Sequence, residues 1–330
     1  MKPSSVSKAV NHLTDVGRPA MLWGMPGVGK SEIMDSVAKH RGVEIRDVRL
    51  SLLDPTDIKG FPVPDVKAKV MRWLPADFLP TKGEGILFFD ELPNAPAAVQ
   101  SAALQLVLTG QIGEYKLPPG WSVHAAGNRT TDRAGAHAML SSLANRFVHV
   151  DVEIDLIDWC EWARNAGVHT DVIAFLRFRP NLMHTFDAAS NARTFASPRT
   201  WKFLSDSYHQ RHTIPKDVAL QVYQGIVGDG AAGEFKAFAD IIKDLPTIDE
   251  VKLNPKKIPV PDKPATLYAL TTALAAAANS NNMDILMQFM SRVSPEFQVL
   301  FMKDAVSRDT TITKTRSFTE WSEKHADVLL

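Results

Sequence analysis

Short runs of apolar residues alternate with longer stretches of helical periodicity through the first half of the chain. The pattern predicts five strands, at residues 20–23, 44–50, 86–89, 122–126 and 147–152. A helix is predicted between the third and fourth strands, from Pro96, which suits a first helical turn, to a stop at Gly110. Because strands alternate with helices, the pattern indicates an α/β fold whose parallel sheet carries helices on both faces.

The second half of the chain, beyond residue 155, has a mainly helical pattern. Helices are predicted at residues 157–166, 171–178, 198–210, 218–227, 267–278 and 283–293. Prolines concentrate between residues 244 and 264, and since proline interrupts helices, this segment is predicted to be a linker. The sequence thus predicts an α/β domain over residues 1–153, a helical domain over 154–243, the linker over 244–264, and helices over 265–330 that complete the helical domain or bind a partner.

Composition narrows the classes of protein to which the chain can belong. Lys plus Arg and Asp plus Glu both number 37, so no overall positive field favours nucleic acid, which is therefore not the expected partner. The single cysteine, Cys160, excludes an internal disulfide and a Cys-rich zinc site, as is typical of a reducing compartment. No apolar run is long enough to span a membrane, so we expect a cytoplasmic protein with no membrane partner.

Residues 24–31, GMPGVGKS, match the phosphate-loop pattern G-x-x-x-x-G-K-[ST] between a predicted strand and a predicted helix. Glycines let backbone amides point at phosphate oxygens, the helix N-terminus adds positive partial charge, and Lys30 can reach the β and γ phosphates. The Ser31 hydroxyl is expected to coordinate Mg²⁺. The predicted nucleotide contacts are Gly24, Met25, Pro26, Gly27, Val28, Gly29, Lys30, Ser31 and Glu32. The motif by itself does not distinguish a kinase, a GTPase and an ATPase.

A second motif, GILFFDE at residues 85–91, is an apolar strand that ends in two carboxylates. We assign Asp90 to the Mg²⁺ ion and Glu91 to the general base that polarises the attacking water. This pair favours hydrolysis over phosphoryl transfer to a small acceptor. Residues 57–60 also match the D-x-x-G of a GTPase switch, but the chain has no N-K-x-D segment that would read guanine, so a GTPase is not favoured.

With these motifs the sequence resembles the AAA+ ATPases, and within them the MoxR and dynein-related branch, from residue 5 to about residue 210. The resemblance implies a P-loop NTPase core of the AAA+ type followed by a helical lid domain, with ATP and Mg²⁺ as cofactors. It also implies catalytic roles for three residues. Asn128 in SVHAAGNR matches the sensor 1 position, Arg146 in SSLANRF the arginine finger, and Arg199 in FASPRTW the sensor 2 position. Arg129 and Arg133 are alternatives to Arg146 for contacts across a subunit interface.

Two predicted hairpins extend the resemblance. Residues 58–75 lie between the second and third strands, like the helix-2 insert of that branch, which faces the pore of the ring or its client. Phe61, Val70 and Trp73 either press on a client there or cover the adjacent sheet edge. Residues 111–121 would form a second hairpin ahead of the strand that leads to Asn128.

The resemblance implies a ring, expected to be a hexamer, in which each ATP site lies between two subunits. The implied function is a Mg²⁺-dependent ATP hydrolase that remodels, activates or assembles a protein client together with a von Willebrand factor A domain protein. Two alternatives stay open. An ATP-driven nucleic-acid motor or loader uses similar rings, although the neutral net charge disfavours it. A binding module, in contrast, would use ATP only as a conformational clamp.

Overall fold

The computed structural model describes residues 1–132, 139–190 and 192–325. Five parallel strands form its main sheet in the order β2-β5-β8-β1-β9. They are β1 Ala20–Trp23, β2 Glu44–Arg49, β5 Gly85–Asp90, β8 Trp121–Gly127 and β9 Val148–Asp151. The five strands predicted from the sequence are confirmed, with each end correct to within one residue. Because β8 lies between β1 and β5, the chain segments that follow these three strands emerge at the same edge of the sheet.

Alternation along each strand sends successive side chains to opposite faces of the sheet. Met21 and Phe89 belong to one core cluster, together with residues of α4 (Ala97–Thr109). Leu22 and Phe88 belong to a second cluster, together with residues of α1 (Pro3–Asp15) and α2 (Lys30–Arg41). The predicted α/β fold, with helices on both faces of a parallel sheet, is therefore confirmed.

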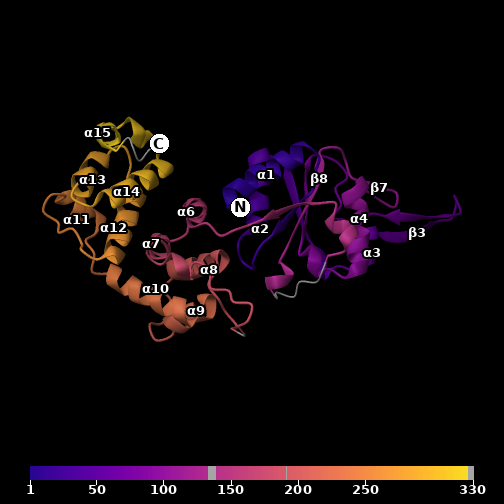
Figure 1. Cartoon of the computed structure of the whole chain (residues 1–330), viewed down its shortest axis with the longest axis horizontal. Helices are drawn as coiled ribbons and strands as arrows, with labels where there is room; N and C mark the ends of the chain where they lie inside the picture. The colour runs from indigo at the N-terminus through magenta and orange to yellow at the C-terminus, as the bar shows by residue number, and fades with distance from the viewer. Residues whose placement is uncertain (133–138, 191, 326–330) are drawn as a thin grey trace. The chain divides into compact units, whose positions relative to one another are not determined.

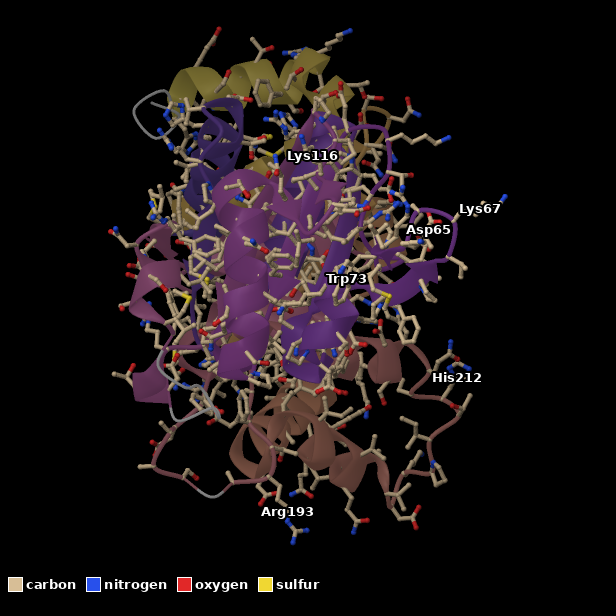
Figure 2. All side chains as sticks on the ribbon, turned by 90° about the vertical axis from the view of Figure 1, so that its right-hand side faces the viewer. Asp65, Lys67, Trp73, Lys116, Arg193 and His212 are labelled. Atoms are coloured by element: carbon tan, nitrogen blue, oxygen red, sulfur yellow. The ribbon has the colours of Figure 1, made fainter. Side chains whose placement is uncertain are left out.

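A two-stranded hairpin, β3 (Phe61–Asp65) with β4 (Val70–Leu74), follows the short helix α3 (Pro55–Lys59) and projects away from the main sheet (Figures 1 and 2). At its base Gly60 has a φ of +87°, and a Cβ atom there would lie 2.0 Å from the Leu74 carbonyl oxygen, so glycine is required. A second hairpin pairs β6 (Gln111–Ile112) with β7 (Tyr115–Lys116). An ion pair of 3.7 Å joins Arg72 of the first hairpin to Glu114 of the second.

The chain divides into two compact units, of which the first, Met1–Asp158 with Phe186–Asn191, contains the sheet. The second, Trp159–Thr185 with Ala192–Leu330, is mainly helical. The helices after the sheet are α6 Leu156–Asn165, α7 Thr170–Phe178, α8 Pro198–His209, α9 Ala219–Val227, α10 Asp229–Ile242, α11 Ile248–Leu253, α12 Pro264–Ala277, α13 Met283–Met290, α14 Pro295–Arg308 and α15 Arg316–Lys324. They include all the helices predicted in this half. Within the described ranges, none of the helices is both long and apolar enough to cross a membrane.

The segment 244–264, predicted to be a linker, contains the helix α11, which Thr247 and Glu250 cap reciprocally. The Val251 side chain is fully buried in a core that it shares with residues of α12, α13 and α14. One of the prolines, Pro264, occupies the first turn of α12. The prolines thus mark helix ends inside a packed unit, and the segment is not a boundary between the two units.

A buried cluster of charges joins the C-terminal helices to the earlier ones within the second unit. The Asp304 carboxylate on α14 accepts hydrogen bonds at 2.8 Å from Arg164 on α6 and from Arg177 on α7. The Asp304 side chain is only 6% exposed. Removal of one partner from such a pair leaves a buried charge without compensation, which typically costs about 3–5 kcal/mol. The helices beyond residue 264 therefore share a core with α6 and α7.

His124 is a fully buried histidine on β8 that connects the sheet to α1. Its Nδ1 atom accepts the backbone N–H of Ala20 at 3.0 Å, and its Nε2 atom lies 3.0 Å from the Thr14 hydroxyl. Because the amide can only donate, the ring is neutral with its proton on Nε2. Burial lowers the pKa of His124 from 6.5 to about 4.

This histidine predicts a pH dependence of stability. Its pKa is lower in the folded chain than in the unfolded chain, so the unfolded state binds more protons as the pH falls from 6.5 toward 4, and stability is lost over that window. Between pH 7 and pH 4.5 we expect the free energy of unfolding to fall by about 2 kcal/mol more in the wild-type chain than in His124→Asn. Urea unfolding at both pH values measures the difference, with His40→Asn on the exposed side of α2 as the control. Equal pH dependence in all three chains would contradict the assignment.

Candidate nucleotide site

The predicted phosphate loop lies between the end of β1 at Trp23 and the start of α2 at Lys30. Two of its glycines have the left-handed backbone that other residues rarely adopt, with φ +77° at Gly27 and +94° at Gly29, the N-cap of α2. Gly24 lies close to its surroundings, since a Cβ atom there would come within 3.2 Å of the Val152 carbonyl oxygen. The loop thus bends tightly into a helix N-terminus, as a phosphate-binding loop must.

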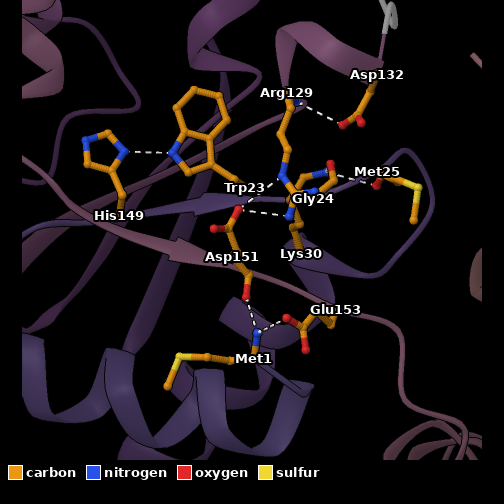
Figure 3. A network of polar contacts seen from close by, with 10 residues as sticks. All are labelled: Met1, Trp23, Gly24, Met25, Lys30, Arg129, Asp132, His149, Asp151 and Glu153. Atoms are coloured by element: carbon orange, nitrogen blue, oxygen red, sulfur yellow. Dashed lines mark hydrogen bonds and ion pairs between the residues drawn. The ribbon is translucent and has the colours of Figure 1, made fainter.

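Lys30 is 9% exposed, and its ammonium group lies beneath the loop. It donates to the carbonyl oxygens of Gly24 at 2.8 Å and Met25 at 3.2 Å, the second of which Figure 3 marks. It also donates at 2.9 Å to the side-chain oxygen of Asn128, directly after β8. The structure therefore brings together two of the predicted site residues, Lys30 and Asn128, from segments 98 positions apart.

Ser31 and Asp90, both predicted to hold Mg²⁺, form a hydrogen bond of 3.0 Å from the serine hydroxyl to the carboxylate. The other Asp90 oxygen accepts the backbone N–H of Glu91 at 2.9 Å. Among the described residues, no group of three or more His, Cys, Asp or Glu side chains could hold a metal. Mg²⁺ usually takes one or two protein oxygens together with substrate phosphates and water, so this pair of oxygens fits it.

Glu91, the predicted base, has a left-handed backbone, with φ +56° and ψ +30°, which is uncommon for a residue other than glycine. Its carboxylate accepts a hydrogen bond from the hydroxyl of Ser51, in the short helical turn η1 (Leu50–Leu52) after β2. Sequence reasoning missed Ser51. The sequence does show a hydroxyl residue directly after a predicted strand. It does not show that this strand pairs with β5, which is what brings Ser51 to Glu91.

Negative charge gathers around this edge of the sheet. Asp47 on β2 lies near Asp90, and its pKa is raised to about 6 by partial burial, and further by the charges of Asp90, Asp35 and Glu91. Burial, assisted by Glu32, also raises the pKa of Asp35 on α2. Sequence reasoning missed Asp47 as well. A divalent cation bound at Asp90 would offset this accumulation of carboxylates.

The Arg129 side chain is held within its own chain. Its guanidinium group makes two contacts with the Asp151 carboxylate at the end of β9, at 3.0 and 2.8 Å, and its backbone N–H donates to Asp132 (Figure 3). These contacts fix the segment that carries Asn128. The other alternative to Arg146, Arg133, lies outside the described residues.

The remaining predicted residues, Glu32, Arg146 and Arg199, are all exposed. Arg146 lies between α5 (Ser141–Ala144) and β9; it is exposed and forms no side-chain hydrogen bond or ion pair with the residues that the structure describes. Glu32 is exposed in the first turn of α2. Arg199 is exposed in the first turn of α8 in the second unit, where Ser197 and Thr200 form a capping box. The roles of Arg146 and Arg199 stay predictions.

A phosphate loop before α2, an acidic pair at the end of β5 and an amide at the end of β8 stand at one edge of a five-stranded parallel sheet. The first unit has a P-loop NTPase fold. This assignment rests on the topology and the loop of the chain itself.

Comparisons with known proteins give distant similarities. No protein-family model matches the chain. A stretch of 168 residues is 27% identical to midasin of Giardia intestinalis and covers 48% of this chain but only 3% of that protein. The structure is similar to NtrX of Brucella abortus, with 15% identity over 92% of this chain and 67% of that one and a TM-score of 0.42. It is also similar to the Holliday junction branch migration motor RuvB of Thermotoga maritima, with 16% identity over 88% and 85% of the chains and a TM-score of 0.41.

The geometry predicts that Lys30→Ala weakens nucleotide binding. Loss of a charged donor next to the phosphates should lower the affinity for ATP at least about tenfold, measured by calorimetric titration. Lys39→Ala, which removes an exposed lysine from the same helix, is the matched control. Unchanged affinity in a folded Lys30→Ala chain would show that the loop does not hold the phosphates.

Proposed function

We propose that the chain is an AAA+ ATP hydrolase that depends on Mg²⁺ and works as a ring, expected to be a hexamer. The observation that carries the proposal is the contact between Ser31 and Asp90, which joins the phosphate loop to the acidic strand end directly beside Glu91. A phosphate-binding loop alone would serve many functions. The added acidic pair provides what hydrolysis needs, a place for the metal and a base for water.

Each residue at this edge has a defined task in the proposed reaction. The loop amides and Lys30 would bind the β and γ phosphates, and Lys30 would exchange its bonds to the loop carbonyls for bonds to phosphate oxygens. Ser31 and Asp90 would hold Mg²⁺, which supplies charge neutralisation when it is bound. The Glu91 carboxylate would accept a proton from the attacking water, while the Asn128 amide orients that water without adding charge. The Ser51 hydroxyl keeps the Glu91 side chain in place.

Glu91→Gln tests the assignment of the base. The amide keeps the size of the side chain but cannot accept the proton, so kcat should fall at least about hundredfold while the affinity for ATP stays within about twofold. Phosphate release and calorimetric titration measure the two quantities. Glu84→Gln changes an exposed glutamate just before β5 and serves as the control. Hydrolysis near the wild-type rate in Glu91→Gln would remove Glu91 from the role of base.

The proposed finger is Arg146. Its exposed guanidinium group has no partner among the described residues, and a permanently charged planar fork suits the charge that develops on a transferred phosphoryl group. An arginine directed at the site of the next subunit explains why a ring would be required for turnover.

Mixed rings test this arrangement. Arg146→Ala alone should lower kcat at least about hundredfold, and so should Lys30→Ala alone. A mixture of the two should regain part of the activity, because some sites then combine an intact loop with an intact finger. Arg18→Ala, an exposed arginine outside the site, is the control. Full activity of Arg146→Ala alone, or no recovery in mixtures whose subunits are shown to exchange, would contradict a finger that acts between subunits.

The hairpin β3–β4 supports a protein as the client. Its large apolar side chains are exposed, with Phe61 at 71%, Val70 at 50% and Trp73 at 39%, so they leave apolar surface for a client. Of its three cations, Arg72 is paired with Asp65 and Glu114, whereas Lys67 and Lys69 at the tip are exposed. We therefore propose that the hairpin contacts a protein client, with a von Willebrand factor A domain protein as partner. Stimulation of the ATPase by DNA would favour the alternative of a nucleic-acid motor.

A further inference from the structure

Trp23 and His149 form a side-chain contact that neither the sequence motifs nor the proposed reaction uses. Trp23 is the last residue of β1, directly before the phosphate loop, and His149 lies on the neighbouring strand β9. The indole N–H donates to Nδ1 of His149 at 2.7 Å (Figure 3). The ring planes are 10° apart and the ring centres 5.9 Å apart, which fits two rings joined edge to edge by this bond.

This contact fixes the protonation of the imidazole. An indole nitrogen can only donate, so Nδ1 of His149 must be the acceptor and the proton of the neutral ring lies on Nε2. Nε2 is 2.9 Å from the carbonyl oxygen of Ala144, to which it therefore donates. The imidazole thus bridges the last residue before the phosphate loop and the last residue of α5.

The carbonyl group of Ala144 belongs to the turn that carries Arg146. The same oxygen accepts the backbone N–H of Phe147 at 3.2 Å, and the N–H of Arg146 donates to the carbonyl oxygen of Leu143 at 3.1 Å. Leu143 and Phe147 are buried in the core cluster against which Trp23 packs, whereas Arg146 is exposed. Two buried neighbours and the imidazole therefore set the direction in which the turn presents Arg146.

We propose that Trp23 and His149 are positioning residues that hold the Arg146 turn in the geometry needed at the site of the next subunit. The inference rests on the proposed role of Arg146 as a finger. His149 is itself exposed, so its bonds do not serve to fill the core. In the proposed ring each subunit contributes a phosphate loop to its own nucleotide site and a finger to the site of its neighbour. The His149 side chain is bonded to the residue before the first and to the turn that carries the second.

Three substitutions separate positioning from packing. His149→Ala removes both bonds of the imidazole, and Trp23→Phe removes the indole donor but keeps an aromatic ring. We expect each to lower kcat about tenfold and to leave the affinity for ATP within about twofold, because the loop itself is intact. His149→Asn, whose amide oxygen can accept the indole N–H, should regain part of the loss. His40→Ala, an exposed histidine on α2, is the control and should match the wild-type chain.

Mixed rings show which half of the site His149 serves. His149→Ala mixed with Lys30→Ala should recover activity. In such a mixture some sites combine the intact loop of a His149→Ala subunit with the correctly positioned finger of a Lys30→Ala subunit. His149→Ala mixed with Arg146→Ala should not recover, since neither chain presents a good finger. Recovery in the second mixture but not in the first, a loss of ATP affinity in His149→Ala, or a wild-type kcat in that variant would overturn the inference. If Arg146→Ala itself keeps wild-type turnover, the proposed finger and the positioning role are overturned together. If only the results for His149 differ from expectation, the positioning role is overturned and the proposed function stands.

Discussion

The ammonium group of Lys30 imposes the main constraint on this site. Lys30 is only 9% exposed, so its charge must keep hydrogen-bonding partners, because an unpaired buried charge costs several kcal/mol. Two of those partners are carbonyl oxygens of the loop, and one is the Asn128 amide at the end of β8. The loop must therefore curl over the lysine, and β8 must end beside it. The placement of Arg129 and its bonds to Asp132 and Asp151 follows from the position of Asn128 in the chain.

The charges around this site suit a nucleotide bound together with a metal ion. On one side the buried ammonium group of Lys30 donates to loop carbonyls and to the Asn128 side chain. On the other side Asp90, Glu91 and Asp47 repel one another, and the raised pKa of Asp47 records that repulsion together with its partial burial. Phosphate oxygens would bring negative charge to the lysine, and a divalent cation would bring positive charge to the carboxylates. Both changes favour the bound state over the free one.

Local patterns in the sequence predicted the elements and motifs, and contacts distant in sequence were not predictable. Apolar runs marked all five strands, and strand, loop and helix signals agree at the loop motif, where Ser31 is hydrogen-bonded to Asp90. Ser51 was missed because its partner, Glu91, lies 40 positions away and the order of the strands decides their contact. The segment 244–264 was predicted as a linker from its prolines, whereas the capping pair Thr247 and Glu250 and the buried Val251 make it part of a core.

Strand β9 gives the proposed ring a physical route between neighbouring sites. Its end residue, Asp151, holds Arg129, and Arg129 follows the amide that binds Lys30. Two positions earlier, His149 holds both Trp23 and the turn before Arg146. An ATP molecule that drew Lys30 away from Asn128 would therefore disturb Arg129 and its bond to Asp151 on β9. The turn that carries Arg146, the proposed finger, is bonded to the same strand through His149. Interactions of this kind are individually worth about 1 kcal/mol, so they bias the finger rather than lock it. In the proposed ring, such a bias at each subunit interface would make the turnover of one subunit depend on the nucleotide state of the next.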